Sequence, residues 1–311
     1  MMHAYTLKAP AKINLLLEII GDRPDGFHEL VMVMQSVNLA DIVELQPLSG
    51  DRIELFCNHP QVPCDQSNLA HRAARLMQEQ FPGKGGVAIT IDKKIPIGAG
   101  LAGGSADAAA VLVGLDLMWG LGLTQAELHT YAAKLGSDIP FCVSGGTALA
   151  LGRGEELTPL PDLDQLYAVL AKYRSLSVAT PWAYKTYRQQ FSESYARDPE
   201  ALEKRRREGH SVELLAAISH RDSQKVPQYL YNDLEKVVLP EHPQVQEIRD
   251  LFQSFGALGT MMSGSGPTVF GLADSRSKAE LMATQLQTAL PDPDLEILVT
   301  KFCSSGIQLL S

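Results

Sequence analysis

The order of apolar and polar positions in the first half of the chain predicts strands that alternate with helices. Residues 11–20 and 30–46 form two strand-like apolar runs separated by Asp25-Gly26, a dipeptide typical of a tight turn between strands. Alternation of apolar and polar residues predicts another strand over residues 87–96. Helical spacing of apolar residues predicts helices, in chain order, over residues 69–81, 105–121 and 124–136.

The second half of the chain has the same mixed character. Prolines and charges predict a domain boundary near residue 155, and a buried strand follows over residues 166–173. The polar segment 187–226 is expected to be mostly helical, with Lys204–Arg207 on a solvated helix face. The last third predicts a helix, a glycine loop, a second helix and a strand. The sequence therefore predicts an α+β fold with two domains, residues 1–155 and 156–311.

Composition and charge limit the functions that this chain can have. A length of 311 residues, at roughly 150 per domain, agrees with two domains. The net charge of −9 disfavours nucleic acid as a partner, because binding to a phosphate backbone requires clustered positive charge. No apolar run is long enough to span a membrane and no secretion signal is recognisable. The four cysteines form no CxxC pair, so we expect reduced thiols and a cytoplasmic protein.

A glycine-rich segment directly before a helix is the strongest candidate for a binding site. Helix N-termini present unpaired backbone N–H groups and partial positive charge, and glycines let an anion approach them closely. The segment is therefore expected to bind phosphate groups. We call it the glycine loop, and it comprises Pro96, Ile97, Gly98, Ala99, Gly100, Leu101, Ala102, Gly103, Gly104, Ser105 and Ala106.

Two other interpretations of the glycine loop remain open on pattern alone. It lacks the Gly-Lys-Ser/Thr of a P-loop, but Gly98, Gly100 and Gly103 satisfy the dinucleotide pattern G-x-G-x-x-G. Lys93, Lys94 and Pro96 separate the preceding strand from the loop, which a dinucleotide-binding unit does not favour. A plain glycine turn that allows close helix packing is the other alternative.

Phosphoryl transfer also requires a cation and a group that activates the acceptor. Lys12, at the start of a predicted strand, is a candidate cation, although an isolated lysine is more often a surface charge. Asp138, in the stretch GSDIPF, is a candidate base. An aspartate two residues before Pro140 is equally typical of a helix N-cap, so the residue pattern alone leaves this role open.

Four separated stretches, PAKINL, PIGAGLAGGSADAAA, GSDIPF and MSGSGPTVF, resemble in order the motifs of the GHMP small-molecule kinases. The resemblance covers nearly the whole chain. It implies two domains, each with a mixed sheet and helices, and an active site in the cleft between them. It also implies that ATP binds with Mg²⁺ against the glycine loop, with Ser105 within reach of the phosphates or the metal. The C-terminal glycine loop, residues 263–266, is then expected to pack against the first.

The resemblance further implies the roles of individual residues. Asp138 accepts the proton of the acceptor hydroxyl, and Lys12 keeps Asp138 ionised and shares the charge that develops on the transferred group. The stretch GDRPDGFHEL resembles the branch of the family that phosphorylates the 2-hydroxyl of a cytidine-diphosphate-linked methylerythritol in the non-mevalonate route to isoprenoids. The implied acceptor site has Asn14 near the reacting end, Phe27 against the cytosine and His28 at the base edge. The stretch TPWAY, residues 180–184, resembles the Thr-Pro segment of the family, which adds Thr180 and places Tyr184 on the other face of the cytosine.

Some features depart from the family pattern or stay open. Ala99, Ala102 and Ala106 replace glycine or hydroxyl residues, and a methyl group at Ala102 is expected to exclude a positive φ there. No acidic residue is an obvious Mg²⁺ ligand, so the metal ligands are unassigned. Neither a membrane nor an obligatory protein partner is implied. The alternatives are a GHMP kinase for another alcohol such as homoserine or a mevalonate derivative, a ligand sensor without catalysis, and a dinucleotide oxidoreductase.

Overall fold

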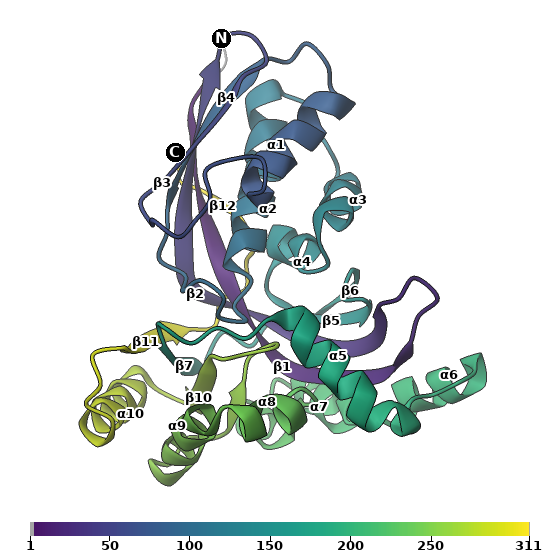
Figure 1. Ribbon diagram of the computed structural model, residues 1–311, viewed down its shortest axis with the longest axis vertical. Coiled ribbons are helices and arrows are strands. Elements are labelled where there is room, and N and C mark those ends of the chain that lie inside the picture. Colours follow the sequence, from purple (N-terminus) through teal and green to yellow (C-terminus); the bar gives the residue numbers. More distant parts are fainter. Residues whose placement is uncertain (1–2, 311) are drawn as a thin grey trace.

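The larger of two β-sheets runs along most of the molecule. The computed structural model describes residues 3–310 (Figure 1). The larger sheet is mixed and has the strand order β12-β1-β2-β4-β3. In addition, β5 pairs with β2, β6 pairs with β5, and β8 pairs with β1. Its strands are β1 (Tyr5–Asp22), β2 (His28–Leu48), β3 (Ile53–Cys57), β4 (Gly86–Asp92), β5 (Thr147–Gly152), β6 (Glu156–Leu160), β8 (Tyr231–Asn232) and β12 (Gln308–Leu309).

The smaller sheet is antiparallel throughout, with the order β11-β7-β10-β9. Its strands are β7 (Tyr167–Tyr173), β9 (Thr260–Met262), β10 (Val269–Ala273) and β11 (Leu295–Lys301). The predicted α+β fold is confirmed, whereas the expectation of a mixed sheet in each half holds only for the larger sheet. The predicted boundary at residue 155 falls in the turn between β5 and β6, which pair in one sheet, so the division into two domains stays a prediction.

Helices cover the two sheets in separate groups (Figure 1). Against the larger sheet lie α1 (Leu69–Gln80), α2 (Gly103–Trp119) and α4 (Ile139–Ser144), and α3 (Gln125–Leu135) packs on these three helices. Helix α2 is apolar on all sides because it is surrounded by α1, α3, α4 and the sheet. The predicted cap of α3 is confirmed, since Thr124 and Glu127 form a capping box. In the second group, α9 (Pro243–Ser254) and α10 (Arg276–Ala289) pack on the smaller sheet. Helix α8 (Glu235–Glu241) packs on α9, and α5 (Thr180–Phe191) packs on α8.

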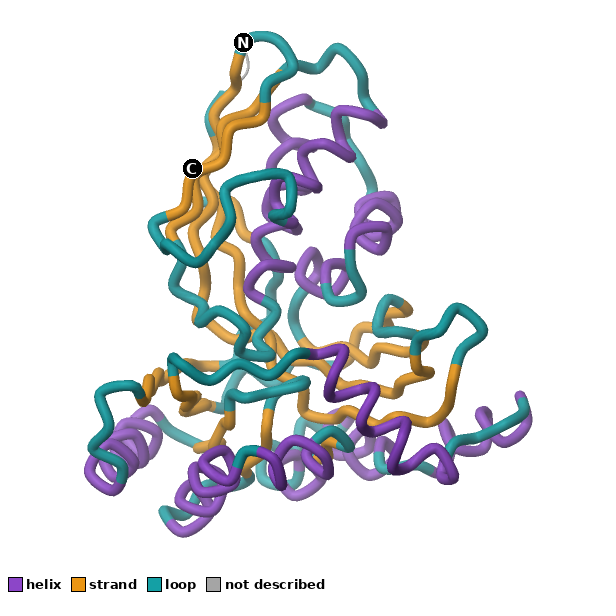
Figure 2. Tube along the Cα trace, viewed as in Figure 1, coloured by secondary structure: helices purple, strands orange, loops and turns teal. Residues whose placement is uncertain are grey.

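The two long strands β1 and β2 connect the upper part of the molecule, which contains α1 to α4, to the lower part, which contains the smaller sheet (Figure 2). Their pairing shifts register between Pro10 and Ala11, between Asn14 and Leu16, and between Ile19 and Gly21. Such bulges increase the bend and twist of a strand pair. Two of these shifts flank the middle part of β1, which carries Lys12 and Asn14.

The polar segment after α5 is helical, as predicted, and packs against the bent end of β1 and β2. It contains η1 (Ser192–Ser194), α6 (Pro199–Glu208), α7 (Ser211–Ser219) and η2 (Val226–Tyr229). Of residues 204–207, predicted as a solvated face, Lys204 and Arg207 are exposed, whereas Arg205 and Arg206 are half-buried and pair with buried carboxylates. Arg205 lies 3.2 Å from the carboxylate of the buried Glu18, and Arg206 donates to Glu29, which is also buried. Buried carboxylates require such partners, and these lie far away in the sequence.

No helix in the described part of the chain is long and apolar enough to cross a membrane.

Gly114 tests the packing of α2 on the larger sheet. A Cβ built there would lie 2.3 Å from Leu45 Cδ1 and 2.9 Å from Leu7 Cδ1, and both leucines are fully buried. We expect Gly114→Ala to lower the free energy of unfolding by about 1–3 kcal/mol through overpacking. Gly104→Ala is the matched control in the same helix, because its Cβ makes an ordinary contact of 3.8 Å. Chemical denaturation of both variants checks this, and equal stabilities would contradict it.

Candidate active site

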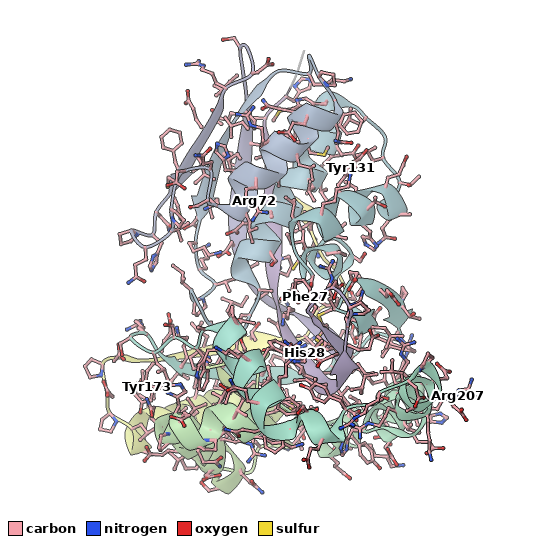
Figure 3. All side chains as sticks on the ribbon, turned by 45° about the vertical axis from the view of Figure 1, so that its right-hand side comes forward. Phe27, His28, Arg72, Tyr131, Tyr173 and Arg207 are labelled. Carbon is pink, nitrogen blue, oxygen red and sulfur yellow. The ribbon has the colours of Figure 1, made fainter. Side chains whose placement is uncertain are left out.

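A cavity of about 830 Å³ lies where the two parts of the molecule meet. Its walls come from the glycine loop, β1, the turn between β1 and β2, the start of α4, the first turns of α5 and the C-terminal glycine loop. Figure 3 shows two of its residues, Phe27 and His28, at the level where the upper and lower parts join. All site residues expected from the sequence line this cavity except Ala106, which is fully buried inside α2.

The glycine loop leads into α2 through three residues with positive φ. Gly98 has φ +59°, Gly100 has φ +73°, and Ala102 has φ 57° and ψ 29°. The prediction that a methyl group excludes a positive φ at Ala102 is therefore wrong. The left-handed conformation costs an L-residue on the order of 1–2 kcal/mol, which the surrounding contacts offset. Ala102 is the N-cap of α2 and has no side chain to cap it, so the N–H groups of the first turn are not capped by that residue.

The C-terminal glycine loop packs tightly against the glycine loop, as the family resemblance implied. Ser263 Oγ donates to the carbonyl of Gly100 at 3.1 Å. A Cβ at Gly100 would lie 2.2 Å from the carbonyl oxygen of Ser263, so only glycine fits. The ammonium group of Lys172 on β7 is buried and donates to the carbonyl of Ile97 at 3.0 Å. The glycine loop is thus attached at two points to the part of the molecule that carries the smaller sheet.

A cluster of ion pairs connects the segment before the glycine loop to the helix after it. This cluster was not predicted from the sequence. Lys93 Nζ donates to Asp41 Oδ2 and to Asp107 Oδ2, both at 2.6 Å, and all three groups are buried. Asp41 Oδ1 also accepts the backbone N–H of Lys94 and of Ile95. Burial raises the pKa of the Asp107 carboxyl despite the adjacent ammonium. The one signal in the sequence is an acidic residue, Asp107, within the mostly small and apolar first half of a helix.

Lys12, Asn14 and Asp138 meet at the centre of the cavity. Lys12 is buried and its Nζ donates to Asn14 Oδ1 at 2.7 Å. Asp138 Oδ2 lies 3.7 Å from the same Nζ. Asp138 is the N-cap residue of α4, but its side chain makes no capping hydrogen bond. The geometry therefore does not support the capping role, and the carboxylate is available in the cavity. Its role as a base stays a prediction.

We define the acceptor arm as the part of the cavity lined by Phe27, His28, Arg153, Thr180 and Tyr184. Phe27 is about half exposed, while His28 is buried with its ring 5.1 Å from that of Tyr184. Thr180 Oγ1 and Ser265 Oγ are 2.8 Å apart, so a hydrogen bond connects α5 to the C-terminal glycine loop. An apolar ring surface beside buried polar groups is suited to a planar heterocycle.

Arg188 on α5 fixes the turn that carries Phe27 and His28. It donates to the Asp22 carboxylate through Nε at 2.8 Å and to the carbonyl of Gly26 at 3.1 Å. Asp25 Oδ1 accepts the N–H of Phe27 within the same turn. Burial, with a smaller contribution from the Arg188 charge, lowers the pKa of His28 to about 4. The His28 ring is therefore neutral at pH 7, and one ring nitrogen can accept a hydrogen bond while the other donates one.

A second group of cavity residues also escaped the sequence analysis. Lys185 and Arg188 on α5 line the cavity, and another part of its wall lies before and at the start of α1. That wall comprises Gln61, Val62, Pro63, Ser67, Asn68 and Leu69. No group of three or more acidic, histidine or cysteine residues in the part of the chain that the structure describes has the geometry of a metal site.

Family models match both halves of the chain. Residues 68–146 match the N-terminal domain of the GHMP kinases, and residues 200–292 match the C-terminal domain of the same family. The chain belongs to the GHMP kinases, which are ATP-dependent small-molecule kinases. The family membership expected from the four sequence stretches is confirmed.

Individual relatives carry a more specific name than the family does. The 4-diphosphocytidyl-2-C-methyl-D-erythritol kinase of Nostoc punctiforme is 58% identical over 100% of this chain and 99% of that protein. The kinase of the same name from Thermosynechococcus vestitus is 59% identical over 98% of this chain and 99% of its own. A crystal structure of 4-(cytidine 5'-diphospho)-2C-methyl-D-erythritol kinase has a TM-score of 0.74 at 32% identity, covering 96% of this chain and 98% of that one.

The fold by itself does not distinguish between acceptors. A homoserine kinase structure from Cytophaga hutchinsonii has a TM-score of 0.78, over 100% of this chain and 98% of that one, but only 20% identity. That likeness shows the fold alone. Any distinction between acceptors has to come from the cavity residues and from the relatives with higher identity.

The low pKa of His28 gives a direct test of the acceptor arm. Because burial and Arg188 disfavour the imidazolium ion, we expect the ring to stay neutral from pH 8 to pH 5 and to gain a proton only near pH 4. NMR titration of the imidazole signals, assigned by comparison with His28→Gln, checks this. A midpoint near 6.5, the ordinary histidine value, would show that the ring is solvated rather than buried.

Proposed function

We propose that this chain transfers the γ-phosphoryl group of ATP to the 2-hydroxyl of 4-diphosphocytidyl-2-C-methyl-D-erythritol, giving the 2-phosphate and ADP in the non-mevalonate route to isoprenoid precursors. The observation that carries the proposal is the meeting of Lys12, Asp138, the glycine loop and the acceptor arm in one cavity. The full-length relatives, at 54–59% identity, are named for this activity and support the same acceptor.

The residues at the centre of the cavity account for the transfer step. Asp138 accepts the proton of the 2-hydroxyl while that oxygen bonds to the γ-phosphorus, and the bond between this phosphorus and the ADP oxygen breaks. Lys12 favours the ionised form of Asp138 and stabilises the charge on the transferred group. Asn14 accepts one N–H of Lys12 and so fixes the direction of the ammonium group. The glycine loop binds the phosphates through the backbone N–H groups at the start of α2.

A Mg²⁺ ion fits this cavity if phosphates and water supply most of its ligands. Mg²⁺ prefers oxygen ligands and usually keeps several waters. Ser105 and Asp138 both line the cavity and offer a hydroxyl and a carboxylate oxygen. When bound, the ion neutralises charge on the phosphates of ATP.

The acceptor arm supports a nucleobase on the acceptor. In the proposal, the cytosine ring lies between Phe27 and Tyr184, and the neutral His28 forms hydrogen bonds with its edge. Thr180 lies at the side of this arm that adjoins the C-terminal glycine loop. A kinase for homoserine or for a mevalonate derivative, which is the main alternative, has no use for an exposed aromatic ring beside a buried histidine.

The first experiment measures ADP release by the purified protein with Mg-ATP, with and without 4-diphosphocytidyl-2-C-methyl-D-erythritol. We expect release that depends on this acceptor, and little release with homoserine or mevalonate. Folded protein that releases ADP with another alcohol and not with this one would overturn the proposed acceptor.

Asp138→Asn tests the base. We expect turnover to fall by about 10²–10⁴-fold, because an amide cannot accept the hydroxyl proton, while the affinity for ATP stays within about twofold. Steady-state kinetics and direct ATP binding measure the two effects. Asp164→Asn, at an exposed position outside the cavity, is the control. Turnover close to that of the unchanged protein would remove Asp138 as the base.

Phe27→Ala tests the stacking of the nucleobase. Loss of the ring should raise the KM for the cytidyl acceptor by about tenfold, since base stacking on an aromatic ring contributes about 1–3 kcal/mol, and should leave the KM for ATP nearly unchanged. Phe56→Ala is a matched control, because Phe56 is 55% exposed against 51% for Phe27 and does not line the cavity. An equal rise in both KM values would contradict the stacking role.

A further inference from the structure

We propose that Arg153 binds the diphosphate of the acceptor and thereby makes the enzyme specific for a nucleoside diphosphate-linked alcohol. This inference rests on the proposed function and adds a residue that neither the family motifs nor the sequence analysis singled out. Arg153 lies in the turn between β5 and β6 and lines the acceptor arm.

The backbone conformation of the turn that carries Arg153 places it close to Asp138. Glycines with positive φ flank the residue, Gly152 at +68° and Gly154 at +113°. A Cβ at Gly154 would lie 2.6 Å from Met32 Cε and 3.9 Å from Ser137 Cβ. Because Ser137 directly precedes Asp138, the turn lies against the segment that carries the proposed base.

The side chain of Arg153 extends from there to the proposed nucleobase site. Its Cζ atom lies 4.8 Å from the centroid of the Phe27 ring, in a cation–π contact. The side chain of Arg153 therefore contacts the proposed nucleobase site at Phe27. The turn of Arg153 adjoins the segment that carries Asp138. A cytidyl acceptor has its diphosphate between the base and the reacting alcohol, so the diphosphate must pass this guanidinium group.

Arg153 has hydrogen-bond donors available for a phosphate. Its backbone N–H donates to Glu155 Oε2 at 2.7 Å and its Nε donates to Glu155 Oε1 at 3.3 Å. Its two terminal NH₂ groups form no hydrogen bond with any residue that the structure describes. A guanidinium group can stack on a ring with its face and donate to phosphate oxygens with its edge at the same time.

The neighbouring cations are less suited to this role. Arg188 is engaged by the Asp22 carboxylate and by a carbonyl of the turn before Phe27. Lys185 lines the cavity but is exposed, and its ammonium group offers no planar pair of donors. Lys12 lies at the reacting end, next to Asp138. Arg153 is therefore the cation whose place and free donors match a diphosphate between the two ends.

Competition by cytidine and CDP against the acceptor separates the diphosphate from the base. In the unchanged protein we expect CDP to bind at least tenfold more tightly than cytidine. In Arg153→Gln, this CDP-to-cytidine preference should fall to about twofold, the KM for the acceptor should rise ten- to hundredfold, and the KM for ATP should change less than twofold. Arg153→Lys should restore part of the preference, because the charge remains without the planar fork.

Two further variants exclude a purely structural role. Glu155→Gln removes the ion pair between Arg153 and Glu155 but keeps the arginine, so it should leave the preference for CDP intact. Arg207→Gln removes an exposed arginine outside the cavity that pairs with Glu203, and should change none of these values. If Glu155→Gln and Arg153→Gln lower the preference equally, Arg153 only stabilises the turn and the inference is wrong.

The outcomes also distinguish this inference from the proposed function. If the unchanged protein turns over the cytidyl acceptor but Arg153→Gln retains the full preference for CDP, the proposed function stands and the role of Arg153 is overturned. If the unchanged protein neither turns over the acceptor nor binds cytidine, both are overturned.

Discussion

The buried ammonium group of Lys12 is the constraint on which the rest of the site depends. A charge removed from water is costly unless polar partners surround it, and Lys12 is only 4% exposed. Its side chain donates to Asn14 on the same strand and approaches the Asp138 carboxylate at the start of α4. Its backbone N–H donates to the carbonyl of Leu101 in the glycine loop at 3.1 Å. One residue of β1 therefore contacts both the glycine loop and the proposed base.

The glycine loop is held in place before any ligand arrives. The C-terminal glycine loop leaves no room for a side chain at Gly100, and Lys172 and Ser263 donate to loop carbonyls from the lower part of the molecule. The Lys93 cluster joins the strand end before the loop to the helix after it. Catalysis of phosphoryl transfer depends mainly on positioning and on fixed charge, so this rigidity serves the chemistry directly.

Local signals in the sequence predict the elements well, but contacts between distant segments decide the site. The glycine loop and α2 were predictable because glycines followed by helix formers act within a few residues. Lys12 and Asp138 were ambiguous by themselves, since nothing in the residue pattern places β1 beside α4, and only the family resemblance favoured them. The Lys93 cluster and the Arg206–Glu29 pair join residues up to 177 positions apart, which no local pattern reports. Ala102 adopts a positive φ although residues with a Cβ disfavour it, because tertiary contacts overcome this preference. The prediction from the sequence treated the preference as an exclusion.

A crystal structure with a non-hydrolysable ATP analogue and 4-diphosphocytidyl-2-C-methyl-D-erythritol tests the central claim most directly. The account predicts the phosphates of the analogue against residues 98–105, and the acceptor 2-hydroxyl within about 2.6–3.2 Å of the Asp138 carboxylate. It also predicts the cytosine beside Phe27 and the γ-phosphorus in line with the same hydroxyl. A ternary complex with the acceptor hydroxyl remote from Asp138, or with the nucleotides exchanged between the two ends of the cavity, would contradict it.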